Sequence, residues 1–235
     1  MTSSGKQGSG HRSLHVRVKS ARNRKPSSTR WLQRQLNDPY VQRARQEGYR
    51  SRAAYKLVEM DDNFKLLTPN SIIVDLGAAP GGWMQVAAHR ALHSTIIGLD
   101  LLPIEPITGT TTLLCDFTTE EGYHLLDAAL IGKKVDLVLS DMAPSTCGHA
   151  ATDHLRIMAM CEIAFDFARH HLKEGGSFVA KVFKGGTERE LLTEMKRCFA
   201  TVKHTKPDSS RKESSEMYVV AQGFRNCSVE NNSLR

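Results

Sequence analysis

Hydrophobic residues along this chain fall into short runs, separated by polar segments and by turns rich in glycine and proline. Seven runs have the length and the β-branched or aliphatic content of strands: 71–76, 95–99, 111–115, 135–140, 177–183, 201–204 and 216–223. Helical spacing of apolar residues predicts helices over 51–67, over a stretch that ends at residue 92, over 153–172 and over 188–199. Because strands alternate with helices, we predict an α/β fold with a mostly parallel sheet and helices on both faces.

The carboxyl-terminal part of the pattern differs from the rest. Only a polar loop, residues 206–215, joins the last two predicted strands. Parallel neighbours need a crossover of a dozen or more residues, which is usually a helix. One of these two strands should therefore run antiparallel, which gives an open sheet with an antiparallel carboxyl-terminal edge.

Composition excludes several classes of protein. The chain has 235 residues, of which 40% are hydrophobic and 24% charged. No apolar run approaches the 18 residues of a membrane span, and the first 30 residues lack the apolar core of a secretory signal. The five cysteines are widely spaced without a Cys-x-x-Cys pair, so neither a disulfide framework nor a zinc site is indicated. We expect a protein of a reducing, cytoplasmic compartment, with no metal and no membrane partner.

The net charge of +7 is concentrated at the amino terminus. Residues 1–30 hold eight Lys or Arg and no acid, whereas the remaining 205 residues hold 24 basic and 25 acidic side chains. We therefore divide the chain into a basic, disordered tail (1–30) and a single domain (31–235). The tail could bind nucleic-acid phosphates, serve as an organellar transit peptide, or act only as a solvated tail.

Candidate ligand-binding groups follow the first three predicted strands. A turn rich in glycine, residues 77–83, follows the first, and Asp100 and Asp116 end the next two. Ligands of such sheets bind at the carboxyl ends of the strands, where a carboxylate can accept hydrogen bonds from ribose hydroxyls or from an amino group. The turn is neither Gly-x-Gly-x-x-Gly nor a phosphate-binding loop. These features favour a nucleoside cofactor over helix caps alone, and S-adenosylmethionine suits them best.

A second set of candidates is catalytic. Lys181 lies within an apolar strand, where a lysine is costly unless it reaches a cleft or a partner. Asp141 ends the fourth strand, Lys56 lies on the first predicted helix, and Glu216 opens the last strand. Lys56 could be a second cation beside Lys181, and Glu216 an anion that orients it. The alternative is a lysine whose head group only reaches solvent from the strand end.

Seven segments, in order, resemble the FtsJ/RrmJ family of ribose 2′-O-methyltransferases, and two further segments, Ser28–Leu32 and Asp38–Gln42, resemble its bacterial branch. The seven are Arg50–Leu57, Val74–Trp83, Asp100–Pro103, Ser140–Pro144, Ala180–Phe183, Lys206–Arg211 and Ser215–Tyr218. The resemblance covers about residues 28–223. It implies the Rossmann-like fold of S-adenosylmethionine-dependent methyltransferases. Ser145 departs from an Asn that is common in the family, and the basic tail is longer than in some members.

The resemblance also implies an activity and a set of site residues. The family transfers a methyl group from S-adenosylmethionine to the ribose 2′-hydroxyl of one uridine in the A loop of 23S ribosomal RNA, and acts on the large subunit. Its catalytic set corresponds to Lys56, Asp141, Lys181 and Glu216. Its cofactor contacts correspond to Gly81, Trp83, Asp100, Asp116 and Asp141. We expect a monomer that uses no metal.

Two other interpretations remain open at this point. One is a 2′-O-methyltransferase of another RNA, such as mitochondrial ribosomal RNA, transfer RNA or a cap. The other is a non-catalytic ribosome-assembly factor, which would have no reason to keep all four catalytic residues.

Overall fold

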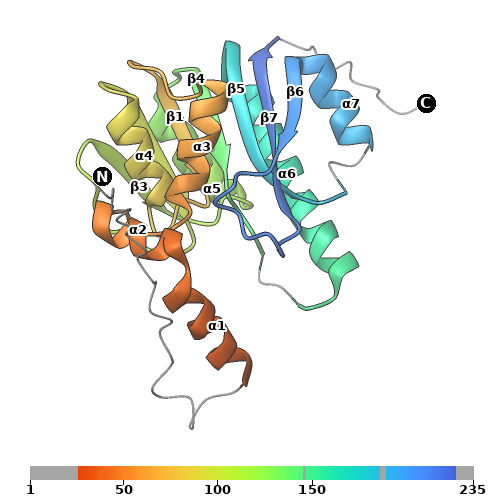
Figure 1. The fold of residues 1–235 in the computed structure, drawn as a ribbon. Coiled ribbons are helices and arrows are strands. Elements are labelled where there is room, and N and C mark those ends of the chain that lie inside the picture. Colours follow the sequence, from red (N-terminus) through yellow and green to blue (C-terminus); the bar gives the residue numbers. More distant parts are fainter. Residues whose placement is uncertain (1–25, 145–146, 186–188, 226–235) are drawn as a thin grey trace, which may run out of the picture.

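A seven-stranded sheet forms the centre of the molecule (Figure 1). The computed structural model describes residues 26–144, 147–185 and 189–225. Its strands are β1 (Ile72–Leu76), β2 (Thr95–Asp100), β3 (Thr110–Leu114), β4 (Val135–Ser140), β5 (Leu172–Phe183), β6 (Phe199–Thr205) and β7 (Glu216–Phe224). The order is β3-β2-β1-β4-β5-β7-β6. The first five strands are mutually parallel, and β7 pairs antiparallel with both β5 and β6. The predicted fold class is confirmed, and the antiparallel strand is β7, which lies between β5 and the edge strand β6.

Helices cover both faces of this sheet (Figure 1). They are α1 (Pro26–Asn37), α2 (Pro39–Glu47), α3 (Ala54–Phe64), α4 (Gly82–Arg90), α5 (Glu120–Leu130), α6 (Ala150–His171) and α7 (Arg189–Cys198). Four of them, α3, α4, α6 and α7, correspond to predicted helices with somewhat different ends. The helices α1, α2 and α5 are not among the predicted ones, although two carry a readable start signal. The side chains of Asp38 and Thr119 accept backbone N–H bonds at the starts of α2 and α5.

The beginning of β5 corrects one boundary. The sequence predicts a strand from residue 177, opened by a turn at Gly175 and Gly176, but the strand starts at Leu172. Both glycines lie inside it, where the pairing with β4 shifts register between Val135 and Leu137. A register shift of this kind leaves residues of the strand unpaired. Glycines are common both at such positions and in turns, so the Gly175–Gly176 pair predicts a turn in the sequence.

A helix crosses the predicted amino-terminal boundary. Residues 1–25 of the predicted tail lie outside the described residues. Helix α1 begins at Pro26, so the predicted boundary at residue 30 falls within a helix. This helix projects away from the sheet (Figure 1). The division into a tail and one domain otherwise stays a prediction.

Two apolar clusters fix the sheet between its helices. One cluster packs α3 and α4 on one face, and includes Leu57, Trp83 and Val179. The other packs α5, α6 and α7 on the opposite face, and includes Phe165 and Phe178. Burial on both faces explains why the central strands read as nearly continuous apolar runs. The polar residues that end these strands are thereby brought to one edge of the sheet.

Three cysteines of the described residues, Cys115, Cys147 and Cys161, are free thiols.

Candidate active site

Four predicted catalytic residues meet at the carboxyl edge of the sheet, although each comes from a different element. The Lys181 Nζ lies 2.8 Å from Asp141 Oδ1 and also donates to the Asp141 carbonyl oxygen at 2.8 Å. The Lys56 Nζ lies 2.8 Å from each carboxylate oxygen of Glu216. Longer distances of 3.9 Å (Lys56 to Asp141) and 4.0 Å (Lys181 to Glu216) close the ring. Two cations and two anions therefore alternate within one network, which we call the tetrad.

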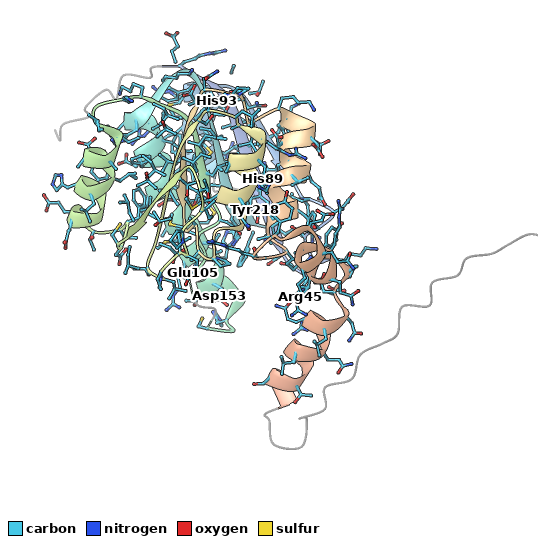
Figure 2. All side chains as sticks on the ribbon, turned by 90° about the vertical axis from the view of Figure 1, so that its left-hand side faces the viewer. Arg45, His89, His93, Glu105, Asp153 and Tyr218 are labelled. Atoms are coloured by element: carbon cyan, nitrogen blue, oxygen red, sulfur yellow. The ribbon has the colours of Figure 1, made fainter. Side chains whose placement is uncertain are left out.

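A fifth residue, Tyr218, forms hydrogen bonds with the tetrad and is not among the predicted site residues. Its hydroxyl donates to Asp141 Oδ1 at 2.7 Å and accepts from Lys56 Nζ at 3.0 Å. The side chain is fully buried in the middle of the molecule (Figure 2). Alternate residues of a strand point to the same face, and Tyr218 comes two positions after Glu216 in the chain, so the two side chains share a face. That spacing is the sequence signal that could have identified it.

Electrostatics in the tetrad favour a charged carboxylate and a protonated phenol. Burial alone acts to raise the pKa of Asp141, but the charges of Lys181 and Lys56, with hydrogen bonds from Lys181 and Tyr218, outweigh it and lower the pKa. Burial and the neighbouring Asp141 and Glu216 carboxylates raise the pKa of Tyr218 well above 10.0. Tyr218 therefore keeps its proton and remains a donor to Asp141.

A cavity of about 450 Å³ opens beside the tetrad. It is lined by Gly77, Ala79, Leu99, Asp100, Leu101, Leu102, Cys115, Asp116, Phe117, Thr118, Asp141, Met142, Ala143, Pro144 and Met160. Three of the five predicted cofactor contacts, the carboxylates, belong to this wall. Asp141 also belongs to the tetrad, so a single side chain joins the two parts of the site.

The other two predicted contacts, Gly81 and Trp83, do not line the cavity. Gly81 precedes α4 with φ of +102°, where a Cβ would meet the Ile107 and Arg50 side chains at 2.8 and 2.9 Å. Trp83 is buried, its indole N–H donates to the Ala53 carbonyl oxygen at 2.8 Å, and its ring lies 5.7 Å from that of Tyr218. In this structure Trp83 therefore connects α4 with Ala53 and β7, and Gly81 lets the Arg50 and Ile107 side chains approach the start of α4.

Asp100 and Asp116 show features both of ligand-binding residues and of caps. Asp100 accepts from the backbone N–H groups of Ala79 and Leu102, each at 2.9 Å. Asp116 accepts from the N–H and the hydroxyl of Thr118, and these bonds lower its pKa. Each acid therefore holds a loop of the cavity wall in place while it faces the cavity.

Asp75 is a buried acid that the sequence analysis does not single out. It is 1% exposed, and neither carboxylate oxygen has a hydrogen-bond partner. Burial, and the nearby Asp141 and Asp100 carboxylates, raise its pKa well above the ordinary 3.8. The cavity wall and the strand behind it thus gather carboxylates, and none of Asp75, Asp100 and Asp116 forms an ion pair within the described part of the chain.

This donor set fits S-adenosylmethionine. The cofactor carries a sulfonium and an ammonium group, and a cavity edged by carboxylates with apolar methionine and leucine walls suits such a cation. The absence of a Cβ at Gly77, where one would meet Met142 Cγ at 2.6 Å, lets the backbone approach that wall closely.

Comparison with known proteins identifies the family. A model of FtsJ-like methyltransferases matches residues 49–224. The chain belongs to the FtsJ-like methyltransferase family. Its predicted Rossmann-like fold and its cofactor, S-adenosylmethionine, are confirmed.

Individual relatives agree with this assignment. Proteins named ribosomal RNA large subunit methyltransferase E are similar to this chain in Sphingopyxis alaskensis (58% identity, covering 96% of this chain and 97% of the relative) and Granulibacter bethesdensis (56%, 92% and 93%). A crystal structure named as a ribosomal RNA methyltransferase from Plasmodium falciparum has a TM-score of 0.68 at 33% identity, and covers 75% of this chain and 98% of that one.

Two other observations concern the expected absences. No helix in the described ranges is long and apolar enough to cross a bilayer. The same residues contain no group of three or more His, Cys, Asp or Glu side chains arranged to hold a metal.

Proposed function

We propose that this FtsJ-like methyltransferase methylates the ribose 2′-hydroxyl of a uridine in the A loop of 23S ribosomal RNA, and that it acts on the large ribosomal subunit. One observation carries the proposal: Asp141 lines the cofactor cavity and pairs with Lys181 at 2.8 Å, so the transferable methyl and a candidate base would meet at one residue. The names of the relatives support ribosomal RNA as the substrate.

In the proposed mechanism, bound S-adenosylmethionine supplies an electrophilic methyl group. The task of the protein is then to orient the 2′-hydroxyl and to remove its proton. Lys181, once it has lost its own proton, is the base, because it lies next to the cavity wall and its position is fixed by two oxygens of Asp141. Lys56 holds the substrate oxygen or stabilises the neutral form of Lys181 through its charge. Glu216 and Asp141 orient the lysines.

The RNA would approach along a groove of about 600 Å³ that reaches Lys56 and Glu216. The groove is lined by Arg34, Gln35, Arg52, Ala53, Lys56, Arg211, Glu213, Ser214 and Glu216. Its basic side chains suit a phosphate backbone. A hydroxyl presented from this groove would reach the tetrad at Lys56 and Glu216, whereas the cofactor cavity reaches it at Asp141.

Methylation assays with several RNAs test the proposal. The protein is incubated with labelled S-adenosylmethionine and, separately, with large ribosomal subunits that lack the modification, capped RNA and transfer RNA. We expect label in the large subunit, and mass spectrometry of nuclease fragments should locate it on one A-loop uridine ribose. Label in transfer RNA or the cap alone would favour another RNA, and no transfer to any RNA would favour an assembly factor.

A further inference from the structure

The loop between β6 and β7 (Lys206–Ser215) holds two adjacent buried serines with different surroundings. Ser210 is 4% exposed, and its hydroxyl donates to Glu216 Oε1 at 2.8 Å. Ser209 is fully buried, and its hydroxyl has no hydrogen-bond partner. Of these two hydroxyls, therefore, only that of Ser210 reaches the tetrad.

The bond from Ser210 affects how Glu216 can meet the lysines. A carboxylate on a free side chain can exchange its two oxygens by rotation about its last bond. Both oxygens lie 2.8 Å from Lys56 Nζ, but only Oε1 is also held by Ser210, and Oε2 is the oxygen that lies 4.0 Å from Lys181. The bond from Ser210 therefore adds a restraint from outside the tetrad that keeps Oε2 on the side of Lys181.

The loop is itself firmly held where Ser210 lies. The backbone N–H of Ser209 donates to both carboxylate oxygens of Glu59 on α3, at 3.2 and 3.0 Å. The carbonyl oxygen of Ser209 accepts from Arg52, whose guanidinium pairs with Asp38 at 2.7 Å. Helix α3, which carries Lys56, therefore also anchors the loop that carries Ser210.

We propose that Ser210 is a positioning residue in the methyl-transfer reaction. Ser210 acts through Glu216 and does not itself contact the substrate. The inference rests on the proposed function, because it assigns the tetrad a catalytic role. It adds to that function a further residue, Ser210 in the loop between β6 and β7, and the hydrogen bond to Glu216 through which Ser210 acts.

A matched pair of variants tests the inference. Ser210→Ala and Ser209→Ala remove the same hydroxyl from neighbouring buried serines. We expect Ser210→Ala to lower the single-turnover methylation rate by about 10- to 100-fold, the range for a hydrogen bond to a charged group, with cofactor affinity unchanged. Ser209→Ala should retain the wild-type rate. Ser210→Thr, which keeps a hydroxyl, should recover much of the loss.

A double variant distinguishes positioning from a general structural role. If Ser210 acts through Glu216, adding Ser210→Ala to Glu216→Ala should cause no further loss of rate. Should Ser210→Ala fold poorly, Ser210→Cys keeps nearly the same shape with a weak donor and is expected to lose rate in the same way.

Three results would overturn the inference: a wild-type rate for Ser210→Ala or Ser210→Cys, an equal loss in Ser209→Ala, or an additive loss in the Glu216→Ala background. A wild-type protein that methylates no RNA would instead contradict the proposed function, so the two failures can be told apart.

Discussion

The two parts of the site differ in how their charges are satisfied. In the tetrad, two lysines and two carboxylates alternate at short distances, and Tyr218 adds hydrogen bonds to the same network. Around the predicted cofactor cavity, Asp100 and Asp116 form no ion pair within the described residues, and Asp75, on the strand behind the wall, has no partner at either oxygen. In the tetrad each charge already lies near an opposite charge in the folded chain, whereas these carboxylates lack a positive charge that the cofactor can bring. If the tetrad is catalytic, the chain alone forms its geometry before the cofactor binds.

The largest expected effect comes from changing Lys181, the proposed base in the tetrad. Lys181→Arg keeps a positive charge, but arginine does not release its proton at physiological pH. If Lys181 is the base, single-turnover methylation should fall by about 10²- to 10⁴-fold while cofactor affinity, measured by calorimetry, stays nearly constant.

Lys56→Arg is the matched control for this change, because a residue that supplies only charge should tolerate arginine better. Both variants are compared between pH 6 and 10. If Lys181→Arg retains more than a tenth of the wild-type turnover, Lys181 is not the base, and the tetrad acts through position and charge only.

Neutralising one carboxylate in each part tests the difference in charge balance directly. Asp141→Asn leaves two mostly buried lysines without their shared carboxylate, so we expect a loss of about 3 kcal/mol in the free energy of unfolding at pH 8. Asp75→Asn removes a buried titratable carboxyl group that has no partner, and should be at least as stable as the wild type. Denaturant unfolding without cofactor measures both, and an equal loss in the two variants would show that the comparison is wrong.

The pH dependence of these two acids should also have opposite signs. The pKa of Asp141 is lowered, so its stabilising contribution is present above the ordinary 3.8 and is lost as the pH falls through its folded-state pKa. The pKa of Asp75 is raised, so the stability linked to it is present below 3.8 and is lost as the pH rises through its folded-state pKa. Asp75→Asn should therefore remove a decline in stability toward high pH, and Asp141→Asn should flatten the decline toward low pH.

A smaller effect is expected at the rim of the cavity. Asp100→Ala should weaken S-adenosylmethionine binding by about 10- to 100-fold, because the variant removes a charged hydrogen-bond acceptor, and leave RNA binding unchanged. Asp62→Ala changes an exposed acid of α3 outside the cavity and serves as the control. An unchanged dissociation constant for Asp100→Ala in calorimetric titration would mean that Asp100 only caps the loops at Ala79 and Leu102.

The smallest effect is expected from the predicted tail, most of which lies outside the described residues. Removing residues 1–25 deletes seven of its eight basic residues and leaves α1 intact. If the tail binds RNA, the log–log salt slope of binding should fall by roughly 0.7–0.9 for each phosphate that the tail neutralises, while cofactor binding is unchanged. Equal binding at several salt concentrations, with and without the tail, would favour a transit peptide or a solvated tail.

Much of the fold could be read from local patterns. The seven predicted strands correspond to β1 to β7, because buried strands need continuous apolar runs and turns need glycine or polar residues. The helices α1 and α2 escape prediction because they have few apolar positions. Periodicity is therefore weak there, and only the Asp38–Pro39 start of α2 is marked.

The features of the site can likewise be divided into those visible in the sequence and those that arise only on folding. The residue types that end the strands are visible in the sequence, which therefore predicts that Asp100, Asp116 and Asp141 share one edge of a parallel sheet. The two-residue spacing from Glu216 also places Tyr218 on the same face of β7. Folding adds the contacts that spacing does not encode: Lys56 meets Glu216 across 160 positions, Ser210 bonds to Glu216, and Asp75 is left without a partner. Strand polarity is a local property that brings the ends of parallel strands to a known edge, whereas hydrogen bonds between distant side chains depend on how helices and loops pack against the sheet.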